Sequence, residues 1–237
     1  MTKDIQIAIL AGGLATRLGK LTKKEPKSLL RIDGKPFIEY QVERIYKQGI
    51  TNIIICAGHL GEQIEKYMGN GKKYGMNIRY SHEESPLGTA GALKKAGNLL
   101  DNEFITMYGD SYLFLDFSSM FDYFLEQDKL ALMTVYKNNG HHEKSNTSIS
   151  GDMVTGYSKN GRNDDMVYID YGAHVLRKEV LELIPENRYF SLEELFPMLI
   201  SKKQLLAFEA RSRYYEVGSI KGIESFSNYI RGKNDSV

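Results

Sequence analysis

The chain has 237 residues and a formal net charge of +1. Without a basic excess it lacks the electrostatic attraction that nucleic-acid-binding proteins use, and no apolar run approaches the roughly 20 residues that span a membrane. The single cysteine, Cys56, excludes an internal disulfide framework and suits a reducing compartment. The N-terminal residues lead directly into an apolar run, so no signal peptide is expected. We therefore expect a cytoplasmic protein whose partners include neither nucleic acid nor a membrane.

Strands and helices alternate through the first half of the chain. Short apolar runs predict strands, and apolar residues at helical spacing predict helices. The expected elements are a strand at 5–10, a helix at 38–48, a strand at 52–56, a helix at 61–68, a strand at 77–81, a helix at 89–99, a strand at 104–108, a helix at 118–126 and a strand at 130–136. This alternation favours an α/β fold with a Rossmann-like, doubly wound and mostly parallel sheet.

After residue 137 the expected elements become shorter and the turns more frequent. They are strands at 147–150, 153–158 and 168–175, a helix at 192–200, a strand at 205–210 and a helix at 220–229. Ser191 and Glu194 have the spacing of a capping box at the start of the helix at 192–200. No linker or repeat interrupts the chain, so we expect one domain over 1–237, made of a half at 1–136 and a half at 137–237.

Two adjacent glycines, Gly12 and Gly13, follow the first expected strand. Glycine lets the backbone approach a ligand closely, and N–H groups beside the start of a helix can bind an anion. Arg17 and Lys27 add positive charge nearby, which favours a phosphate. The spacing after Gly13 does not fit a Walker A loop, and adjacent rather than alternate glycines do not fit the dinucleotide fingerprint. The alternative is a tight turn that binds nothing.

The loop belongs to a longer pattern. Leu10-Ala11-Gly12-Gly13, Thr16-Arg17-Leu18 and Pro26-Lys27-Ser28-Leu29 together resemble the signature of the sugar-1-phosphate nucleotidyltransferases, or nucleotide-sugar pyrophosphorylases. Later segments that also resemble the family are Pro86-Leu87-Gly88-Thr89-Ala90-Gly91, Gly109-Asp110, Tyr171-Gly172 and Glu216-Val217-Gly218-Ser219. The resemblance covers nearly the whole chain and is strongest up to residue 112. The chain resembles the short single-domain type, such as mannose- or heptose-1-phosphate guanylyltransferases and muramate-1-phosphate uridylyltransferases, and the resemblance implies a GT-A-like fold.

The resemblance implies that 1–136 is the nucleotide-binding half. The nucleotide-binding residues that it implies are Leu10, Ala11, Gly12, Gly13, Thr16, Arg17, Lys27, Pro86, Gly88, Thr89 and Asp110. Three of these are expected to be catalytic. Arg17 would hold the leaving β and γ phosphates, Lys27 would bridge the α-phosphate and the incoming sugar phosphate, and Asp110 would bind Mg²⁺. A plain turn or helix cap is the alternative for Asp110.

The half at 137–237 is implied to bind the sugar phosphate. Lys159 resembles the family's lysine for the sugar 1-phosphate, although the usual Glu-Lys-Pro surroundings are missing, and a solvated turn lysine is the alternative. Asp170 and Gly172 are expected beside the sugar, while Asp170 could instead cap a strand edge. Glu216 would complete the metal site, at a position where most of the family has Asp.

These residues imply nucleotidyl transfer. An oxygen of a sugar 1-phosphate attacks the α-phosphorus of a nucleoside triphosphate, and because that phosphate is ionised at neutral pH no general base is needed. We expect GTP or UTP and a mannose- or heptose-type sugar, for surface glycan synthesis. The alternatives are a cytidylyltransferase for a non-sugar phosphate such as phosphocholine, and a non-catalytic nucleotide-sugar sensor. A homo-oligomer is left open, since no patch in the sequence marks an interface.

Overall fold

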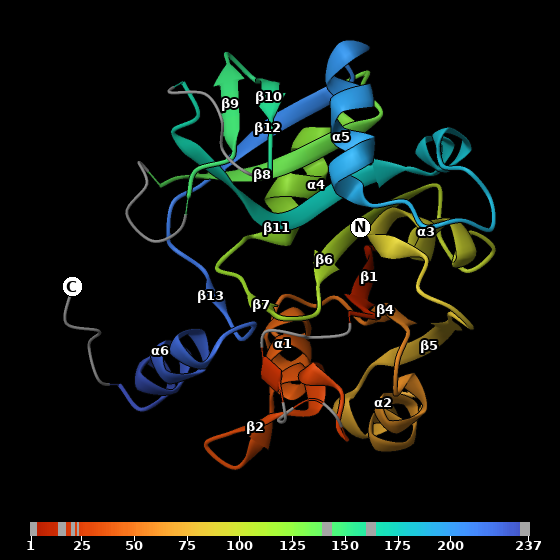
Figure 1. Cartoon of the computed structure of the whole chain (residues 1–237), viewed down its shortest axis with the longest axis vertical. Coiled ribbons are helices and arrows are strands. Elements are labelled where there is room, and N and C mark those ends of the chain that lie inside the picture. Colours follow the sequence, from red (N-terminus) through yellow and green to blue (C-terminus); the bar gives the residue numbers. More distant parts are fainter. Residues whose placement is uncertain are drawn as a thin grey trace.

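The computed structural model describes residues 4–13, 18–19, 22, 24–138, 144–159 and 165–232. Within these residues a nine-stranded sheet runs through the molecule, with helices on both of its faces (Figure 1). The strand order is β5 (Asn77–His82), β4 (Asn52–Ala57), β1 (Gln6–Ala11), β6 (Glu103–Tyr108), β11 (Tyr168–Arg177), β8 (Ala131–Lys137), β12 (Leu205–Ala210), β10 (Met153–Tyr157) and β9 (Thr147–Ser150).

The helices cover the sheet, and four short strands form two separate two-stranded sheets. The helices are α1 (Phe37–Tyr46), α2 (Gly61–Met68), α3 (Gly88–Lys95), α4 (Phe117–Leu125), α5 (Leu192–Ser201) and α6 (Ile220–Ile230), with short 3₁₀ helices η2 (Lys27–Leu29), η3 (Lys72–Tyr74) and η4 (Lys178–Leu183). The short strands are β2 (Arg31–Ile32), which pairs with β3 (Lys35–Pro36), and β7 (Ser111–Tyr112), which pairs with β13 (Tyr215–Glu216). None of the helices described is both long and apolar enough to cross a bilayer.

The period of two in β1 explains why helices cover both faces of the sheet. Ile7 and Ile9 pack into the apolar cluster that contains α1, α2 and α4, whereas Ala8 and Leu10 pack into the cluster that contains α3 and α5. Successive side chains of a strand point to opposite faces, so a continuous apolar run needs cover on both sides. The expected α/β architecture with a doubly wound first half is confirmed.

The expectation of a mostly parallel sheet is right for the first half and wrong for the second. Strands β4, β5 and β6 extend the parallel set that begins with β1. In contrast, β11 runs antiparallel to β6 and β8, and β10 runs antiparallel to β9 and β12, while β8 and β12 are parallel. The two-residue turn at Gly151-Asp152 is too short for a crossover helix, so β9 and β10 must pair antiparallel.

Helix ends differ from the expected ones where tertiary contacts compete with the helix. The helix expected at 89–99 ends at Lys95, and the carbonyl of Leu99 accepts hydrogen bonds from the side chains of Gln6 and Arg79 instead. The capping box of α5 is confirmed: the N–H of Ser191 donates to the carboxylate of Glu194 at 2.8 Å.

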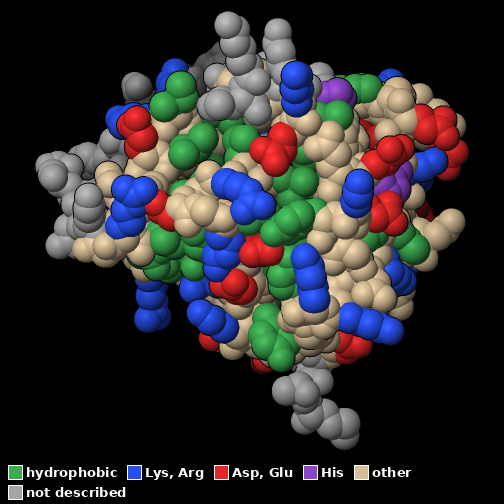
Figure 2. Space-filling view, turned by 90° about the horizontal axis from the view of Figure 1, so that it is seen from below, with side chains coloured by type: hydrophobic (Ala, Val, Ile, Leu, Met, Phe, Trp, Pro, Cys, Tyr) green, Lys and Arg blue, Asp and Glu red, His purple; other side chains and the backbone are tan. Residues whose placement is uncertain are grey.

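The side chains at the surface and in the core agree with the composition. On the face drawn in Figure 2, Lys and Arg side chains lie among Asp and Glu side chains, as the formal net charge of +1 leads one to expect.

Cys56, on β4, is buried, and burial raises the pKa of its thiol to about 12. A buried, protonated cysteine of this kind packs as a small hydrophobic side chain.

The carboxyl ends of β1, β4 and β6 converge because their backbones touch. Leu10 of β1 lies opposite Tyr108 of β6, and the N–H of Gly109 donates to the carbonyl of Leu10 at 2.9 Å. A Cβ on Gly58, just after β4, would lie 2.8 Å from the carbonyl oxygen of Gly12. The loops after these three strands therefore leave the sheet side by side.

Gly88, the first residue of α3, packs against the backbone of the loop that precedes α5. Its φ is +76°, and a Cβ there would lie 2.7 Å from the carbonyl oxygen of Phe190, in the loop before α5. We expect Gly88→Ala to lower the free energy of unfolding by about 2–4 kcal/mol, because the left-handed backbone and the clash both oppose the side chain. Urea unfolding measures this change.

The matched control is Gly151→Ala. Gly151 shares the left-handed backbone, with a φ of +60°, but nothing lies within 4 Å of its hypothetical Cβ. Its substitution should therefore cost only the backbone strain, about 1 kcal/mol. Equal losses for the two variants would show that the contact with Phe190 does not constrain Gly88.

Candidate active site

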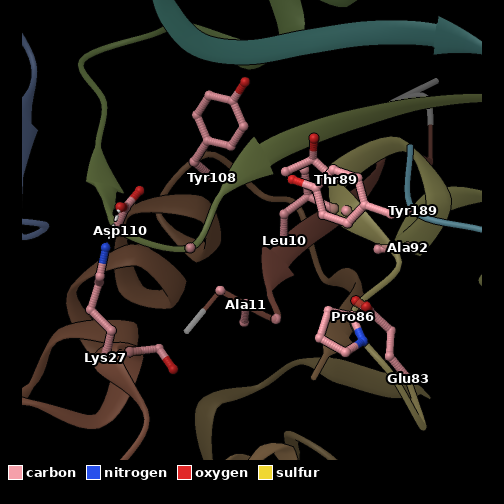
Figure 3. Close-up of a pocket in the computed structure, with 15 residues that line it drawn as sticks. Leu10, Ala11, Lys27, Glu83, Pro86, Thr89, Ala92, Tyr108, Asp110 and Tyr189 are labelled. Atoms are coloured by element: carbon pink, nitrogen blue, oxygen red, sulfur yellow. Dashed lines mark hydrogen bonds and ion pairs between the residues drawn. The ribbon is translucent and has the colours of Figure 1, made fainter. Parts of the chain in front are cut away.

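A cavity of about 430 Å³ opens where β1 and β6 end (Figure 3). Ligands of open α/β sheets bind at the carboxyl ends of the strands. The residues that line the cavity are Leu10, Ala11, Gly12, Gly13, Lys27, Ser28, Glu83, Pro86, Gly88, Thr89, Ala92, Tyr108, Gly109, Asp110 and Tyr189. The described residues of the expected nucleotide-binding set thus all lie on one cavity.

The two adjacent glycines form a bare stretch of backbone beside the cavity. A Cβ on Gly12 would lie 2.7 Å from Oε1 of Glu83, so a side chain at this position would displace its neighbour. Gly13 has no atom within 4 Å of its hypothetical Cβ and is exposed. Close approach of a ligand to the backbone is the usual reason for glycine in such a loop. Thr16 and Arg17 lie outside the described residues, so their expected phosphate contacts stay a prediction.

Lys27 and Asp110 form an ion pair at one side of the cavity. Nζ of Lys27 lies 2.7 Å from Oδ2 of Asp110, and the side chains are 16% and 27% exposed. Lys27 opens the 3₁₀ helix η2, after Pro26 in extended conformation, and Asp110 follows β6. The hydroxyl of Ser111 lies 3.4 Å from Oδ1 of Asp110. The two charges neutralise each other in the free protein. A phosphate can take the place of Asp110 beside Lys27, provided that a cation takes the place of Lys27 beside Asp110.

Glu216 is brought next to Asp110 by the pairing of β13 with β7. Glu216 lies opposite Ser111, and the N–H of Val217 donates to the carbonyl of Asp110 at 2.9 Å. The Glu216 carboxylate accepts hydrogen bonds from the N–H of Gly218 at 2.6 Å and from the Ser219 hydroxyl at 2.8 Å, just before α6. No group of three or more His, Cys, Asp or Glu side chains that could hold a metal occurs among the described residues. The expected metal role of Glu216 stays a prediction.

Glu83 was missed in the sequence and lies at the other end of the cavity, beside Pro86 (Figure 3). It follows β5, and its Oε2 accepts a hydrogen bond from the N–H of Leu87 at 2.8 Å. Burial raises the pKa of the Glu83 carboxyl, and the hydrogen bond from Leu87 opposes that rise. Its signal in the sequence is an acid at the end of an expected strand, three residues before Pro86.

The three residues expected at the sugar do not line the cavity wall. Gly172, with a φ of +93°, is packed so that a Cβ would lie 3.1 Å from the ring of Tyr108. Asp170 is 8% exposed and lies behind the same ring, 3.4 Å from the Tyr108 hydroxyl. The exposed Lys159 pairs with Glu193 of α5 at 2.7 Å. The sugar contacts of these three residues stay predictions. Tyr108 was expected only as the last residue of a strand, but it lines the cavity.

Comparison with proteins of known sequence places the chain in a family. The family model described as "Nucleotidyl transferase" matches residues 7–231. A D-glycero-alpha-D-manno-heptose 1-phosphate guanylyltransferase from Aneurinibacillus thermoaerophilus is 31% identical over 217 residues, covering 90% of this chain and 93% of the relative. A mannose-1-phosphate guanyltransferase from Saccharomyces cerevisiae is 30% identical and covers 90% of this chain, but this chain spans only 61% of that relative.

Solved structures agree with the sequence comparison. HddC from Yersinia pseudotuberculosis, complexed with GMP-PN, superposes with a TM-score of 0.78 at 25% identity, covering 95% of this chain and 99% of that chain. A UDP-glucose pyrophosphorylase complexed with UDP-glucose has a TM-score of 0.81 at 17% identity, covering 97% and 99%, and so supports the fold alone. With a family match that spans nearly the whole chain and sugar-1-phosphate guanylyltransferases among its relatives, the chain belongs to the nucleotidyl transferase family.

Proposed function

We propose that the protein joins a nucleoside triphosphate to a sugar 1-phosphate and releases an NDP-sugar and pyrophosphate. The observation that carries this proposal is the Lys27–Asp110 pair, 2.7 Å apart, in the same cavity as the bare backbone of Gly12 and Gly13. An ammonium group and free backbone suit phosphate oxygens, and a carboxylate suits the cation that accompanies a triphosphate. Relatives that are sugar-1-phosphate guanylyltransferases support the same reaction class.

The reaction needs positioned charge rather than a general base. The second pKa of a phosphate is about 6, so the sugar phosphate is ionised at neutral pH and its oxygen can attack the α-phosphorus directly. The new P–O bond forms as the bond to the leaving pyrophosphate breaks. Lys27 would hold oxygens of both the α-phosphate and the sugar phosphate, and Arg17 would hold the leaving phosphates. Bringing two polyanions together in this way is the main barrier that such sites lower.

Mg²⁺ fits the carboxylates near the phosphate end of the cavity. Asp110 and Glu216 stand on segments joined by the β7–β13 pairing, and two carboxylates are a typical protein contribution to a Mg²⁺ site that also uses substrate phosphates and water. The ion would neutralise phosphate charge when bound. Asp110 would leave Lys27, freeing that ammonium for the phosphates.

We propose GTP as the triphosphate, and the heptose- and mannose-1-phosphate guanylyltransferases among the relatives support a heptose- or mannose-type acceptor. Guanine presents two adjacent N–H donors, at N1 and at the exocyclic amine, whereas uracil presents one. A carboxylate is acceptor-only and suits a pair of donors. Glu83 supplies such a carboxylate beside Pro86. Glycosyltransferases use nucleotide-activated sugars as donors. We therefore propose that the reaction takes place in the cytoplasm and supplies such a donor for glycan synthesis.

The role of Lys27 is tested by Lys27→Met, which keeps the unbranched side chain out to Cε and removes the ammonium group. We expect kcat/KM for pyrophosphate release from GTP and mannose or heptose 1-phosphate to fall by about 10²–10³, the usual loss when one charge-stabilising donor is removed. Lys72→Met, at an exposed lysine of η3, is the control and should match the wild type. Activity retained in Lys27→Met would contradict the assignment. No release by the wild type with any sugar 1-phosphate, but release with phosphocholine, would favour the cytidylyltransferase alternative.

The metal proposal is tested by a Mg²⁺ titration after removal of metal with EDTA. We expect no pyrophosphate release without the ion and full recovery on its addition. Asp110→Asn should raise the half-saturating Mg²⁺ concentration by about tenfold or more, because an amide oxygen carries no charge to attract the cation. An unchanged titration curve for this variant, with turnover intact, would remove Asp110 from the metal site.

The role of Glu83 is tested with GTP and UTP in parallel. Glu83→Gln should lower kcat/KM for GTP by about tenfold and leave UTP nearly unchanged, because the amide replaces one acceptor by a donor. Glu84→Gln, at the exposed neighbour, is the control. The raised pKa of Glu83 means that its carboxylate is protonated at a higher pH than an ordinary glutamate. The GTP preference of the wild type should therefore decline as pH falls through that pKa, and that of Glu83→Gln should not.

A further inference from the structure

The wall of the cavity opposite its proposed base end contains a tyrosine that no role above uses. In Figure 3, Tyr108 extends away from Pro86 and Glu83, and its hydroxyl points toward the strand β11. That hydroxyl lies 3.4 Å from Oδ2 of Asp170. A phenol has one proton to donate and an oxygen that can also accept.

Asp170 is fixed by its own strand. The N–H of Gly172 donates to Oδ1 of Asp170 at 2.9 Å, and Nε2 of the buried His174 lies 2.9 Å from the same oxygen. A carboxylate can only accept, so Nε2 carries the proton; Nδ1 of His174 has no partner among the described residues. With both donors on Oδ1, the second oxygen, Oδ2, is left to face Tyr108.

The ring of Tyr108 is held as firmly as the carboxylate. On one side lies the backbone of Gly172, where a Cβ would come within 3.1 Å of the ring. On another side the ring of His174 meets it edge-on, with centroids 5.7 Å apart. The hydroxyl can therefore change its hydrogen bonds while its oxygen stays in place.

We propose that Tyr108 sets sugar specificity by accepting a hydrogen bond from one hydroxyl of the bound sugar 1-phosphate, with Asp170 as the positioning residue behind it. The single proton of the phenol points to the carboxylate, so the lone pairs of its oxygen are free for a donor from the cavity. Sugar hydroxyls are such donors.

This inference rests on the proposed function, because it assigns the cavity wall near Asp110 to the acceptor sugar. Tyr108 is two residues before Asp110 on the same segment, so a ligand group on Tyr108 lies close to the phosphate end. The sequence expectation that Asp170 contacts the sugar changes accordingly: Asp170 acts on the sugar through the phenol.

The first test is Tyr108→Phe, which removes one oxygen and keeps the ring. We expect the KM for the sugar 1-phosphate to rise about tenfold, and the KM for GTP to stay within about twofold of the wild type. Tyr123→Phe, the same change on α4 against Phe208, is the control and should leave both KM values unchanged. A rise in the KM for GTP alone, or no rise at all, would overturn the inference.

The second measurement uses a panel of monodeoxy sugar 1-phosphates with both enzymes. For one analogue the wild type and Tyr108→Phe should become equal, because that analogue lacks the hydroxyl that Tyr108 binds. A penalty of the same size on every analogue would indicate a merely structural role for the phenol and would overturn the inference. Absence of turnover by the wild type with every sugar 1-phosphate would overturn the proposed function as well, whereas normal turnover with an unaffected Tyr108→Phe overturns this inference alone.

Asp170→Asn tests the positioning role at the carbon that the analogue panel identifies. The amide oxygen must stay at the Oδ1 position to accept from Gly172 and His174, so the amide NH₂ faces Tyr108. The phenol would then accept from this amide and turn its own proton to the cavity. We expect Asp170→Asn to discriminate in favour of the deoxyfluoro analogue over the deoxy analogue at the identified carbon, since fluorine accepts and cannot donate. Unchanged discrimination between the two analogues would overturn the positioning role.

Discussion

The parallel register between β1 and β6 is the constraint on which the site depends. Because the N–H of Gly109 donates to the carbonyl of Leu10, the two strands end at the same level and their loops emerge together. A Cβ on Gly109 would lie 2.7 Å from that carbonyl oxygen, so the approach of the two backbones leaves no space for a side chain. The bare turn at Gly12 and the carboxylate of Asp110 share one cavity as a result, although about a hundred residues separate them along the chain.

The second half of the chain adds two supports to this frame from opposite directions. The short strand β13 pairs with β7 and so ties Glu216 to the segment that carries Asp110. The long strand β11 runs antiparallel beside β6 and places Asp170 and His174 behind the wall formed by Tyr108. One support bears on the phosphate end of the cavity, and the other bears on its side wall. The antiparallel strands thus finish a site that the parallel strands begin.

Much of the fold could be predicted because strong periodicity marks it. The sequence around β1, β4 and β6 is apolar, and the apolar runs of β1 and β6 end just before Gly12 and Asp110. The phosphate end of the site could therefore be predicted from the sequence. The direction of the strands after residue 137 could not be predicted, because it depends on the length of the connections and on the pairing of β11 with β6. The two-residue strands β7 and β13 are too short to show a period. Glu83 and Tyr108 were missed for a related reason: each stands at a strand end, where a side chain's surroundings are decided by distant segments.

The burial of Cys56 has a practical consequence. A thiol is alkylated only as the thiolate, and this one is kept protonated and out of reach by the same packing that holds β4 against α3. It is also the only cysteine in the chain. Labelling by a thiol reagent therefore reports how often the packing around β4 opens, with no second site to obscure the signal. A native residue thus serves as a built-in probe of conformational opening, and nucleotides or sugar phosphates that tighten the fold can be ranked by how far they slow that labelling, without mutation or dye.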